Sequence, residues 1–216
     1  MLLLAAFFAV ILCIPGWADT LYIQPSNQAN AYASQNNINT TYDNFQLGST
    51  STVSEVEWTG MYFNVSSFSP QTGTINSWNI NFYADNAGQP GSILSTTQIS
   101  GNGGEAFLGN TSLGNYIINW YTYDVAGLSF NASAGTQYWL SVVPNLQTIQ
   151  PQWFWSTGTD GDNKAYQGVS SLQLRAADMA FTLIGPTATT VPEPTSLLLL
   201  GTGLGVIGLA AWRRRK

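Results

Sequence analysis

The sequence contains no histidine, and its single cysteine, Cys13, lies in an apolar stretch near the N-terminus that we expect to be removed. The remaining chain therefore has no residues for a disulfide, for a Ser-His-Asp or Cys-His nucleophilic site, or for a zinc site built from imidazole and thiolate. We expect no cofactor. These absences exclude whole classes of hydrolases and metalloproteins.

Charged residues are also few, at 8% of the sequence, and they are unevenly distributed. Four of the six basic residues stand together at the C-terminal end: Arg213, Arg214, Arg215 and Lys216. The body of the chain, from Asp19 to Asp178, has only Lys164 and Arg175 against ten acidic residues, so its formal side-chain charge is −8. A body of this sign repels phosphate backbones, and we expect no nucleic-acid partner.

The N-terminus has the pattern of a signal peptide. Residues 2–14 form an apolar run too short to span a bilayer comfortably, and the small residues Gly16 and Ala18 follow it. We predict a signal peptide over residues 1–18 that is cleaved between Ala18 and Asp19. The alternative is an uncleaved anchor, because the basic region that usually opens a signal peptide is missing.

The C-terminal segment has the pattern of a membrane anchor. Residues 195–212 carry no charge, and a helix of this length covers roughly 27 Å, close to the thickness of a hydrocarbon core. We therefore predict a transmembrane helix over residues 195–212. The basic tail at 213–216 then stays in the cytoplasm as a stop-transfer signal, which leaves the preceding residues outside.

Pro192, Glu193 and Pro194 stand directly before this apolar segment. The two prolines keep the backbone extended and accessible to a protease. The order V-P-E-P, apolar helix and R-R-R-K resembles the PEP-CTERM sorting signal of exported bacterial proteins. This resemblance implies a Gram-negative host that makes extracellular polysaccharide, and cleavage near Pro-Glu-Pro by an exosortase, a membrane protease-transpeptidase. It also implies a single-pass intermediate in the inner membrane, followed by the cell surface or the extracellular matrix.

Between its two ends, the chain has the period of β-strands. In "SWNINFYAD" the apolar residues Trp78, Ile80 and Phe82 alternate with polar ones, which places them on one face of a strand. The same alternation recurs at two places: Tyr138, Leu140 and Val142, and Met179, Phe181 and Leu183. Further β-rich runs occupy residues 53–65, 115–125 and 151–156.

Turn-rich pieces such as "DNAGQPGS" and "GTDGDN" separate these runs, and no long helix is indicated before residue 195. We predict an all-β fold, an antiparallel, jelly-roll-like β-sandwich over residues 19–184, followed by a Pro- and Thr-rich linker at 185–194 that ends in Pro-Glu-Pro. The stretches "INFYADNAGQPGSIL", "AGTQYWLSVVP" and "PQWFWS" are similar to a β-sandwich domain of exported bacterial proteins, some with carbohydrate-binding-like architecture. This resemblance implies a fold rather than an activity.

Two tryptophans in the body form a candidate glycan platform. Trp153 and Trp155 share one face of a predicted strand, and aromatic faces pack against the apolar C–H faces of sugar rings. The alternative interpretation is that this face of the strand fills the core of the sandwich.

The acidic residues offer two further candidate sites. Oxygen ligands of the kind that calcium prefers stand in one glycine-containing loop: Asp160, Asp162 and Asn163. A full EF-hand loop needs a glutamate further on, and here a lysine follows directly, so the alternative is an Asx-rich turn. Glu55 and Glu57 share a strand face, where paired carboxylates about 5–9 Å apart hydrolyse glycosides. The alternative is a solvated face whose charges discourage aggregation.

These patterns predict an exported cell-surface or extracellular-matrix protein that is not an enzyme and whose sandwich binds glycan weakly through exposed aromatic rings. Its expected partners are an exosortase-like protease, the membrane and extracellular polysaccharide. The alternative function is a carboxylate-dependent extracellular glycoside hydrolase, and a third hypothesis is a purely structural protein.

Overall fold

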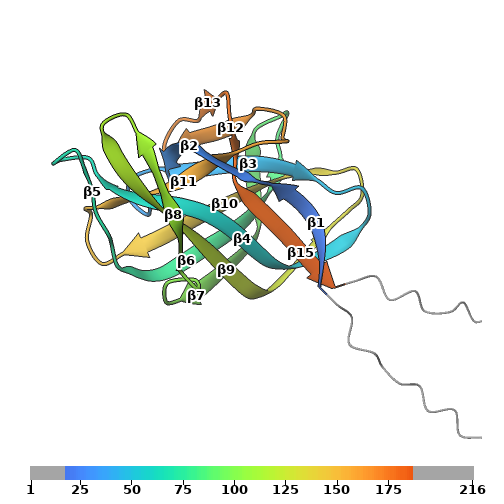
Figure 1. The fold of residues 1–216 in the computed structure, drawn as a ribbon. Helices are drawn as coiled ribbons and strands as arrows, with labels where there is room; N and C mark the ends of the chain where they lie inside the picture. Colours follow the sequence, from blue (N-terminus) through green and yellow to red (C-terminus); the bar gives the residue numbers. More distant parts are fainter. Residues whose placement is uncertain (1–17, 187–216) are drawn as a thin grey trace, which may run out of the picture. The chain divides into compact units, whose positions relative to one another are not determined.

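Two antiparallel β-sheets packed face to face make up residues 18–186, the part of the chain that this computed structural model describes (Figure 1). The all-β, antiparallel sandwich predicted from the alternating sequence is therefore confirmed. The predicted transmembrane helix at 195–212 and the basic tail at 213–216 lie outside the described residues, as does the signal peptide up to residue 17. No helix long and apolar enough to cross a membrane occurs within residues 18–186.

The strands follow one another along the chain with short connections. They are β1 (Ala18–Gln24), β2 (Ser26–Ala33), β3 (Thr40–Gln46), β4 (Ser51–Asn64), β5 (Ser69–Pro70), β6 (Ile75–Asp85), β7 (Pro90–Ser100), β8 (Ala106–Leu113), β9 (Tyr116–Ala132), β10 (Gln137–Leu146), β11 (Gln152–Gly158), β12 (Ala165–Gly168), β13 (Gln173–Arg175), β14 (Asp178–Met179) and β15 (Phe181–Pro186). The three runs of β-rich sequence correspond to β4, β9 and β11.

The larger sheet has nine strands and is built around β4. One edge of β4 pairs with β9 from Ser51 to Met61, and the other edge pairs with β15 over Glu55–Trp58 and then with β11 over Gly60–Phe63. β1 lies beyond β15, β2 and β14 pair with β11, and β8 pairs with β9. The smaller sheet has six strands in the order β13-β12-β3-β10-β6-β7.

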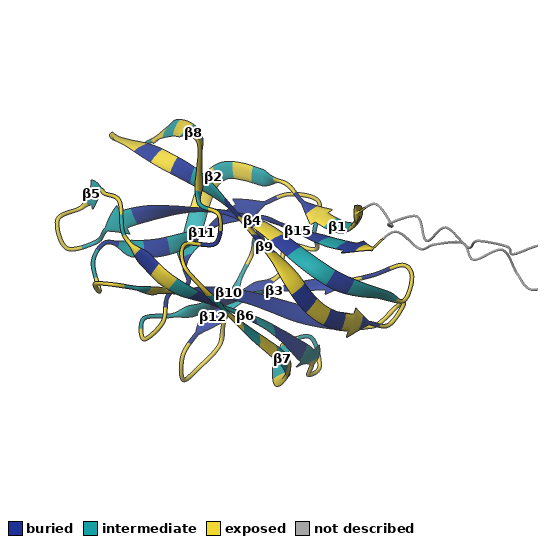
Figure 2. Ribbon diagram, turned by 90° about the horizontal axis from the view of Figure 1, so that it is seen from below, coloured by how far each residue is buried: buried dark blue, intermediate teal, exposed yellow. Residues whose placement is uncertain are grey.

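The core lies between the two sheets, where the apolar residues on the inner face of one sheet contact those on the inner face of the other (Figure 2). Trp78, Ile80 and Phe82 of β6 are at most 1% exposed, as the period of two predicts. The Trp78 ring packs edge-to-face against two indoles of the larger sheet, with ring centroids 4.7 Å from Trp58 and 4.9 Å from Trp153. Such aromatic pairs add roughly 0.5–1.5 kcal/mol each beyond the area they bury, so these tryptophans strengthen the contact between the sheets.

The two ends of the described chain pair with each other. Ala18 at the start of β1 lies opposite Pro186 at the end of β15, and Asp19 lies opposite Gly185. Gly185 and Pro186, which the sequence analysis placed in the linker, are thus the last residues of a strand, because β1 extends the pairing to them. All the strands and the core lie between Ala18 and Pro186, so this segment holds what a domain needs to fold on its own.

Candidate functional site

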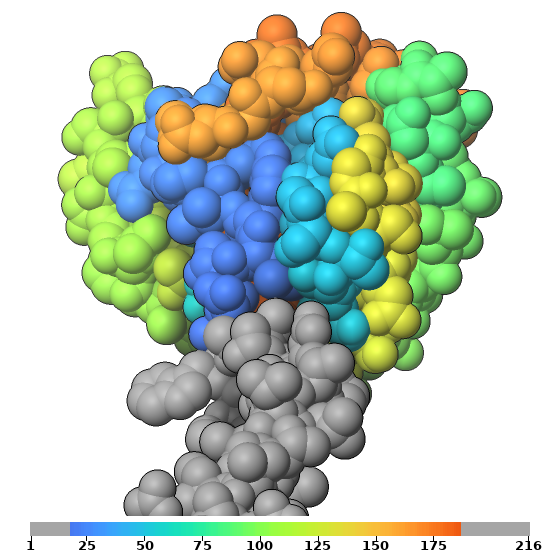
Figure 3. Space-filling model, turned by 90° about the vertical axis from the view of Figure 1, so that its right-hand side faces the viewer, coloured from blue at the N-terminus to red at the C-terminus, as the bar shows by residue number. Residues whose placement is uncertain are grey.

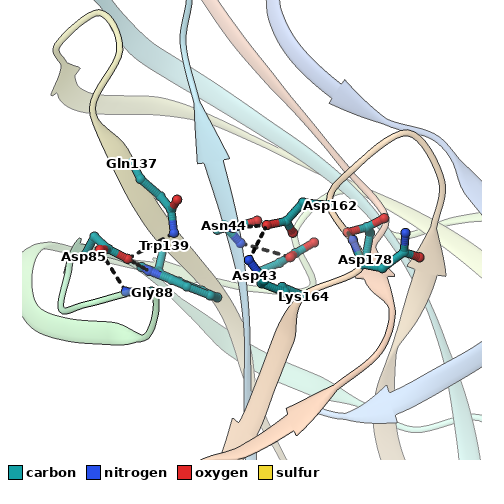
Figure 4. Close-up of polar contacts among 10 residues, drawn as sticks. Asp43, Asn44, Asp85, Gly88, Gln137, Trp139, Asp162, Lys164 and Asp178 are labelled. Carbon is teal, nitrogen blue, oxygen red and sulfur yellow. Dashed lines mark hydrogen bonds and ion pairs between the residues drawn. The ribbon is translucent and has the colours of Figure 1, made fainter.

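An acidic loop between β11 and β12 contains the residues predicted to bind calcium (Figure 4). Asp160 and Asn163 both have left-handed backbone conformations, with φ of 70° and 58°, as Asx residues in turns often do. Asp162 Oδ2 accepts a hydrogen bond from Asn44 Nδ2 at 3.1 Å and lies 3.5 Å from Lys164 Nζ in an exposed ion pair. Oδ2 of Asp162 is therefore engaged by donors of the protein itself.

Two buried carboxylates from distant parts of the sequence lie next to this loop. Asp43 of β3 is completely buried: its Oδ1 accepts from the Asn44 backbone N–H at 2.9 Å, and its Oδ2 accepts from the Met179 backbone N–H at 2.6 Å. Asp178 of β14 is 2% exposed, and its Oδ1 accepts from the Asn163 backbone N–H at 2.7 Å. Together they tie β3, β14 and the acidic loop to one another.

Burial raises the pKa of the Asp43 carboxyl well above its usual range, the backbone donor at Met179 counteracts this, and the nearby Asp178 raises the pKa further. Gln24 of β1 completes the environment. With its amide oriented to satisfy its neighbours, Nε2 donates to Asp43 Oδ2 and to the Met179 carbonyl, both at 2.6 Å, while its oxygen accepts from the Tyr22 hydroxyl at 2.8 Å. Asp43 is thus the polar centre of a joint between strands of both sheets.

The arrangement of these oxygens does not favour calcium. Calcium takes six to eight oxygen ligands that converge on one point, whereas each carboxylate here faces backbone, amide, hydroxyl or ammonium donors. Within residues 18–186 no group of three or more acidic side chains is placed to hold a metal ion. The loop has the geometry of an Asx-rich turn, the alternative interpretation of its sequence.

Trp153 and Trp155 do not form a glycan platform, which corrects that prediction. Both side chains are 0% exposed, and both point into the space between the sheets. Trp153 Nε1 donates to the Tyr123 hydroxyl at 3.1 Å, and Trp155 Nε1 donates to the Ala180 carbonyl at 2.8 Å. The reason is that β11 is an inner strand of the larger sheet, so one of its faces must cover the core. The alternative interpretation, that this face fills the core, is confirmed.

The aromatic rings that do reach solvent gather elsewhere, on the outer face of the larger sheet. Phe68 and Tyr116 are 67% and 37% exposed, and with Phe63 and Phe154 they line an apolar groove of about 380 Å³. The Tyr116 hydroxyl is the only polar side-chain group in the lining. Sugar recognition needs several convergent hydrogen-bonding groups in addition to an apolar surface, and this groove does not provide them.

Glu55 and Glu57 lie on the outer face of β4, and the structure adds a third carboxylate to them. Asp124 of β9 is directly opposite Glu57 in the antiparallel ladder. Desolvation, followed by the charge of Asp124, raises the pKa of Glu55. Glu57 and Asp124 line a shallow polar groove of about 250 Å³, and both are exposed to solvent. Asp124 could not be paired with Glu57 from sequence, because strand neighbours 67 positions apart depend on the topology.

A third polar cluster holds the turn between β6 and β7 (Figure 4). Asp85 Oδ1 accepts from Trp139 Nε1 at 2.8 Å and from Gln137 Nε2 at 3.0 Å, and its Oδ2 accepts from the Gly88 backbone N–H at 3.0 Å. Each donor lies on β10 or in the turn itself. The cluster is a structural clamp, since every contact of the carboxylate fixes a strand or a turn.

The predicted sorting and processing residues lie at the ends of the chain. Ala18 and Asp19, the predicted signal cleavage site, are the first two residues of β1. The remaining predicted residues lie outside the described part: Pro192, Glu193, Pro194, Arg213, Arg214, Arg215 and Lys216.

Comparison with known families identifies the C-terminal segment. The sequence model of the PEP-CTERM protein-sorting motif matches residues 190–216. No curated protein and no solved structure gives a significant match to the chain. The chain therefore carries a PEP-CTERM sorting motif, which implies an exported protein that passes the membrane and is processed by an exosortase, itself a membrane protein.

Proposed function

We propose that this protein is a non-enzymatic component of the cell surface or extracellular matrix, which an exosortase releases from a membrane-bound intermediate by a cut near Pro192-Glu193-Pro194. The observation that carries the proposal is the sorting motif at residues 190–216, immediately after the last strand of the body. The final destination in extracellular polysaccharide is part of this proposal.

The separation of the motif from the fold supports the proposed processing. β15 ends at Pro186, and every strand and core residue of the described chain precedes that point. A cut near Pro192 therefore removes no residue that the sandwich uses. Removal of the predicted signal peptide after Ala18 likewise leaves β1 with all but its first residue. Both predicted cuts leave the body intact.

The chemistry of the body supports a non-enzymatic role. The chain beyond Cys13 has neither histidine nor cysteine. The buried carboxylates Asp43 and Asp178 are held by donors of the protein, and the exposed carboxylates Glu57 and Asp124 face each other in a shallow groove. The raised pKa of Glu55 has its causes in desolvation and the charge of Asp124, and it does not by itself supply the two separate carboxylate roles that a glycoside hydrolase needs.

The test is the intact mass and location of the full-length protein in an exosortase-containing host and in the same host without the enzyme. We expect a product that ends near residue 192, outside the cytoplasmic membrane, only when the exosortase is present. Changing Pro192, Glu193 and Pro194 together to alanine should leave the uncut chain in the membrane fraction. The matched control is Glu57→Ala, which removes an acidic residue from the body and should leave processing unchanged.

Two results would contradict the proposal. One is full-length soluble protein in the cytosol, and the other is the same shortened product with and without the exosortase. Cleavage of a polysaccharide by the purified body, abolished by Glu55→Gln or Glu57→Gln, would replace the non-enzymatic role by the hydrolase.

A further inference from the structure

The end strand of the smaller sheet, β7, has a free edge. It pairs with β6 along one side, and no other described strand pairs with it. In the space-filling view, the green segment that contains β6 and β7 lies at the side of the body, next to the yellow segment of β10 (Figure 3). An unpaired strand edge presents a row of N–H and C=O groups that another strand can complete.

The sequence of β7, "PGSILSTTQIS", has few of the usual protections of an edge strand. It contains no charged residue, and its one proline is the first residue. Its pairing with β6 is regular over the six residues from Ser95 to Ser100, since the irregularities lie nearer the turn, between Phe82 and Asp85 of β6. β-branched residues favour the extended conformation here, and Ile93 and Leu94 are 59% and 50% exposed.

The turn before β7 holds this strand rigidly in place. Ala87 and Gly88 both have positive φ, 55° and 80°, and the flanking Asn86 and Gln89 exchange backbone hydrogen bonds at 2.8 and 3.2 Å. This is the type I′ geometry of tight hairpins, and Asp85 of β6 ties it to β10 through Gln137 and Trp139. A second strand would therefore meet a preformed edge.

The other sheet edges are each protected. β13 is three residues long and includes Arg175. β1 carries Asp19 and an irregularity between Thr20 and Tyr22, and β8 has one between Phe107 and Gly109.

In β2 the backbone N–H groups of Ala29 and Ala31 are occupied by the side chains of Asn27 and Asn30, and Gln28 has a positive φ of 52°. β5 and β14 also lie at edges of the larger sheet, and each is only two residues long. Of these seven outer strands, β7 has the longest regular and uncharged run, six residues against five in β8.

The distribution of charge allows two copies of this chain to meet at this edge. The body has a side-chain charge of −8, so two copies repel each other over most of their surfaces. The three neighbouring strands β7, β6 and β10 together hold one charged residue, Asp85, whose carboxylate is already held by three donors. This edge is therefore where two acidic bodies meet with the least repulsion.

We infer that β7 pairs antiparallel with β7 of a second copy, joining the smaller sheets of two bodies into one continuous sheet. The pairing is self-complementary, as a two-fold dimer requires, because each strand offers the other the same backbone groups. This inference concerns the folded body and does not depend on the sorting of the chain.

The test is the self-association of residues 19–186, measured by sedimentation over a wide range of protein concentration. We expect a concentration-dependent dimer. Thr96→Lys and Thr96→Glu, at an exposed position of β7, should each weaken the association constant by roughly tenfold, since each places two like charges in the interface. The matched controls are Ser112→Lys and Ser112→Glu on β8, which make the same charge changes on an edge of the larger sheet and should leave association unchanged.

Substituting both lysine and glutamate distinguishes the effect of a charge at this position from the effect of the net charge of the body. Lysine reduces the negative charge of the body and glutamate increases it, so a general repulsion between bodies would respond in opposite directions. A second measurement uses the absence of cysteine from residues 19–186. Under oxidising conditions, cysteine placed in turn at Leu94, Thr96 and Gln98 should give a disulfide-linked dimer at the position nearest the two-fold axis, and Ser112→Cys should not.

Three outcomes would overturn the inference. They are a monomer at every concentration, an association weakened by the β8 variants rather than the β7 variants, and opposite effects of lysine and glutamate at Thr96. Circular dichroism of each variant checks that its body is folded, so that a loss of the dimer is not a loss of the fold.

Discussion

Replacing Gly60 by alanine tests whether Trp153 is a rigid part of the core. Gly60 lies on β4, and an added Cβ would stand 2.2 Å from Cζ2 and 2.5 Å from Cε2 of the Trp153 indole, and 2.8 Å from the Phe154 carbonyl oxygen. Contacts below 3.0 Å do not occur for real Cβ atoms, so the ring has to move. It is 0% exposed and its Nε1 donates to Tyr123, so it has no free space to enter.

The cost of this change follows from overpacking. Inserting a methyl group into a closely packed core costs about 1–3 kcal/mol, and a bulky ring backed by other rings places Gly60→Ala at the upper end, about 3 kcal/mol. Urea denaturation of residues 19–186, followed by tryptophan fluorescence, measures the loss as a lower midpoint at unchanged slope.

A double-mutant cycle identifies the cause of the loss. Trp153→Leu removes the ring that the new Cβ would meet, so Gly60→Ala should cost about 1–2 kcal/mol less in the Trp153→Leu background than in the parent. A loss below about 0.5 kcal/mol for the single variant would refute the reasoning, because surface substitutions have effects of that size. Trp153 would then be free to turn outward, and the aromatic platform would have to be reconsidered.

Three further predictions concern the carboxylates. Burial raises the pKa of Asp43 above its value in the unfolded chain. The contribution of Asp43 to the free energy of unfolding is therefore full below about pH 4 and is lost as the pH rises through the folded pKa. Denaturation at several pH values should show that the free energy of unfolding of Asp43→Asn depends less on pH. Glu57→Gln should stabilise the body by roughly 0.2–1 kcal/mol, because it removes the repulsion between the like charges of Glu57 and Asp124. A decrease of the same size in the free energy of unfolding would contradict this repulsion. Asp85→Ala should cost about 1–3 kcal/mol because it leaves the buried Trp139 N–H without its acceptor, while Asp85→Asn, which keeps an acceptor oxygen, should cost less.

The strands were predictable because their signal is local. Trp78, Ile80 and Phe82 alternate with polar residues in the sequence and are buried in the structure, and the same holds for Leu140 and Val142 of β10. A period of two fixes which residues share a face, and one face of each sheet must cover the core. Periodicity and turn residues were therefore sufficient to predict an antiparallel sandwich.

Which face of a strand points into the core could not be predicted, because it depends on the order of the strands in the sheet. In "PQWFWS" the alternation separates Trp153 and Trp155 from Phe154, but only the place of β11 between β4 and β2 decides that the indoles point inward. The joint between Asp43 and Asp178 depends in the same way on β3 and β14 meeting beside the acidic loop. No spacing in the sequence encodes a contact between strands so far apart, and the buried carboxylates were missed for that reason.

The same distinction explains why the sorting signal could be identified from the sequence alone. The motif needs no partner strand, because its information is contained in consecutive residues at 190–216. The chain from Pro186, the last strand residue, to Pro192 spans at most about 20 Å when fully extended. An exosortase that cuts near Pro192 must therefore work close to the edge formed by β1 and β15. Because the contacts within the sandwich end before this segment begins, the proposed cut would break no strand pairing of the described residues.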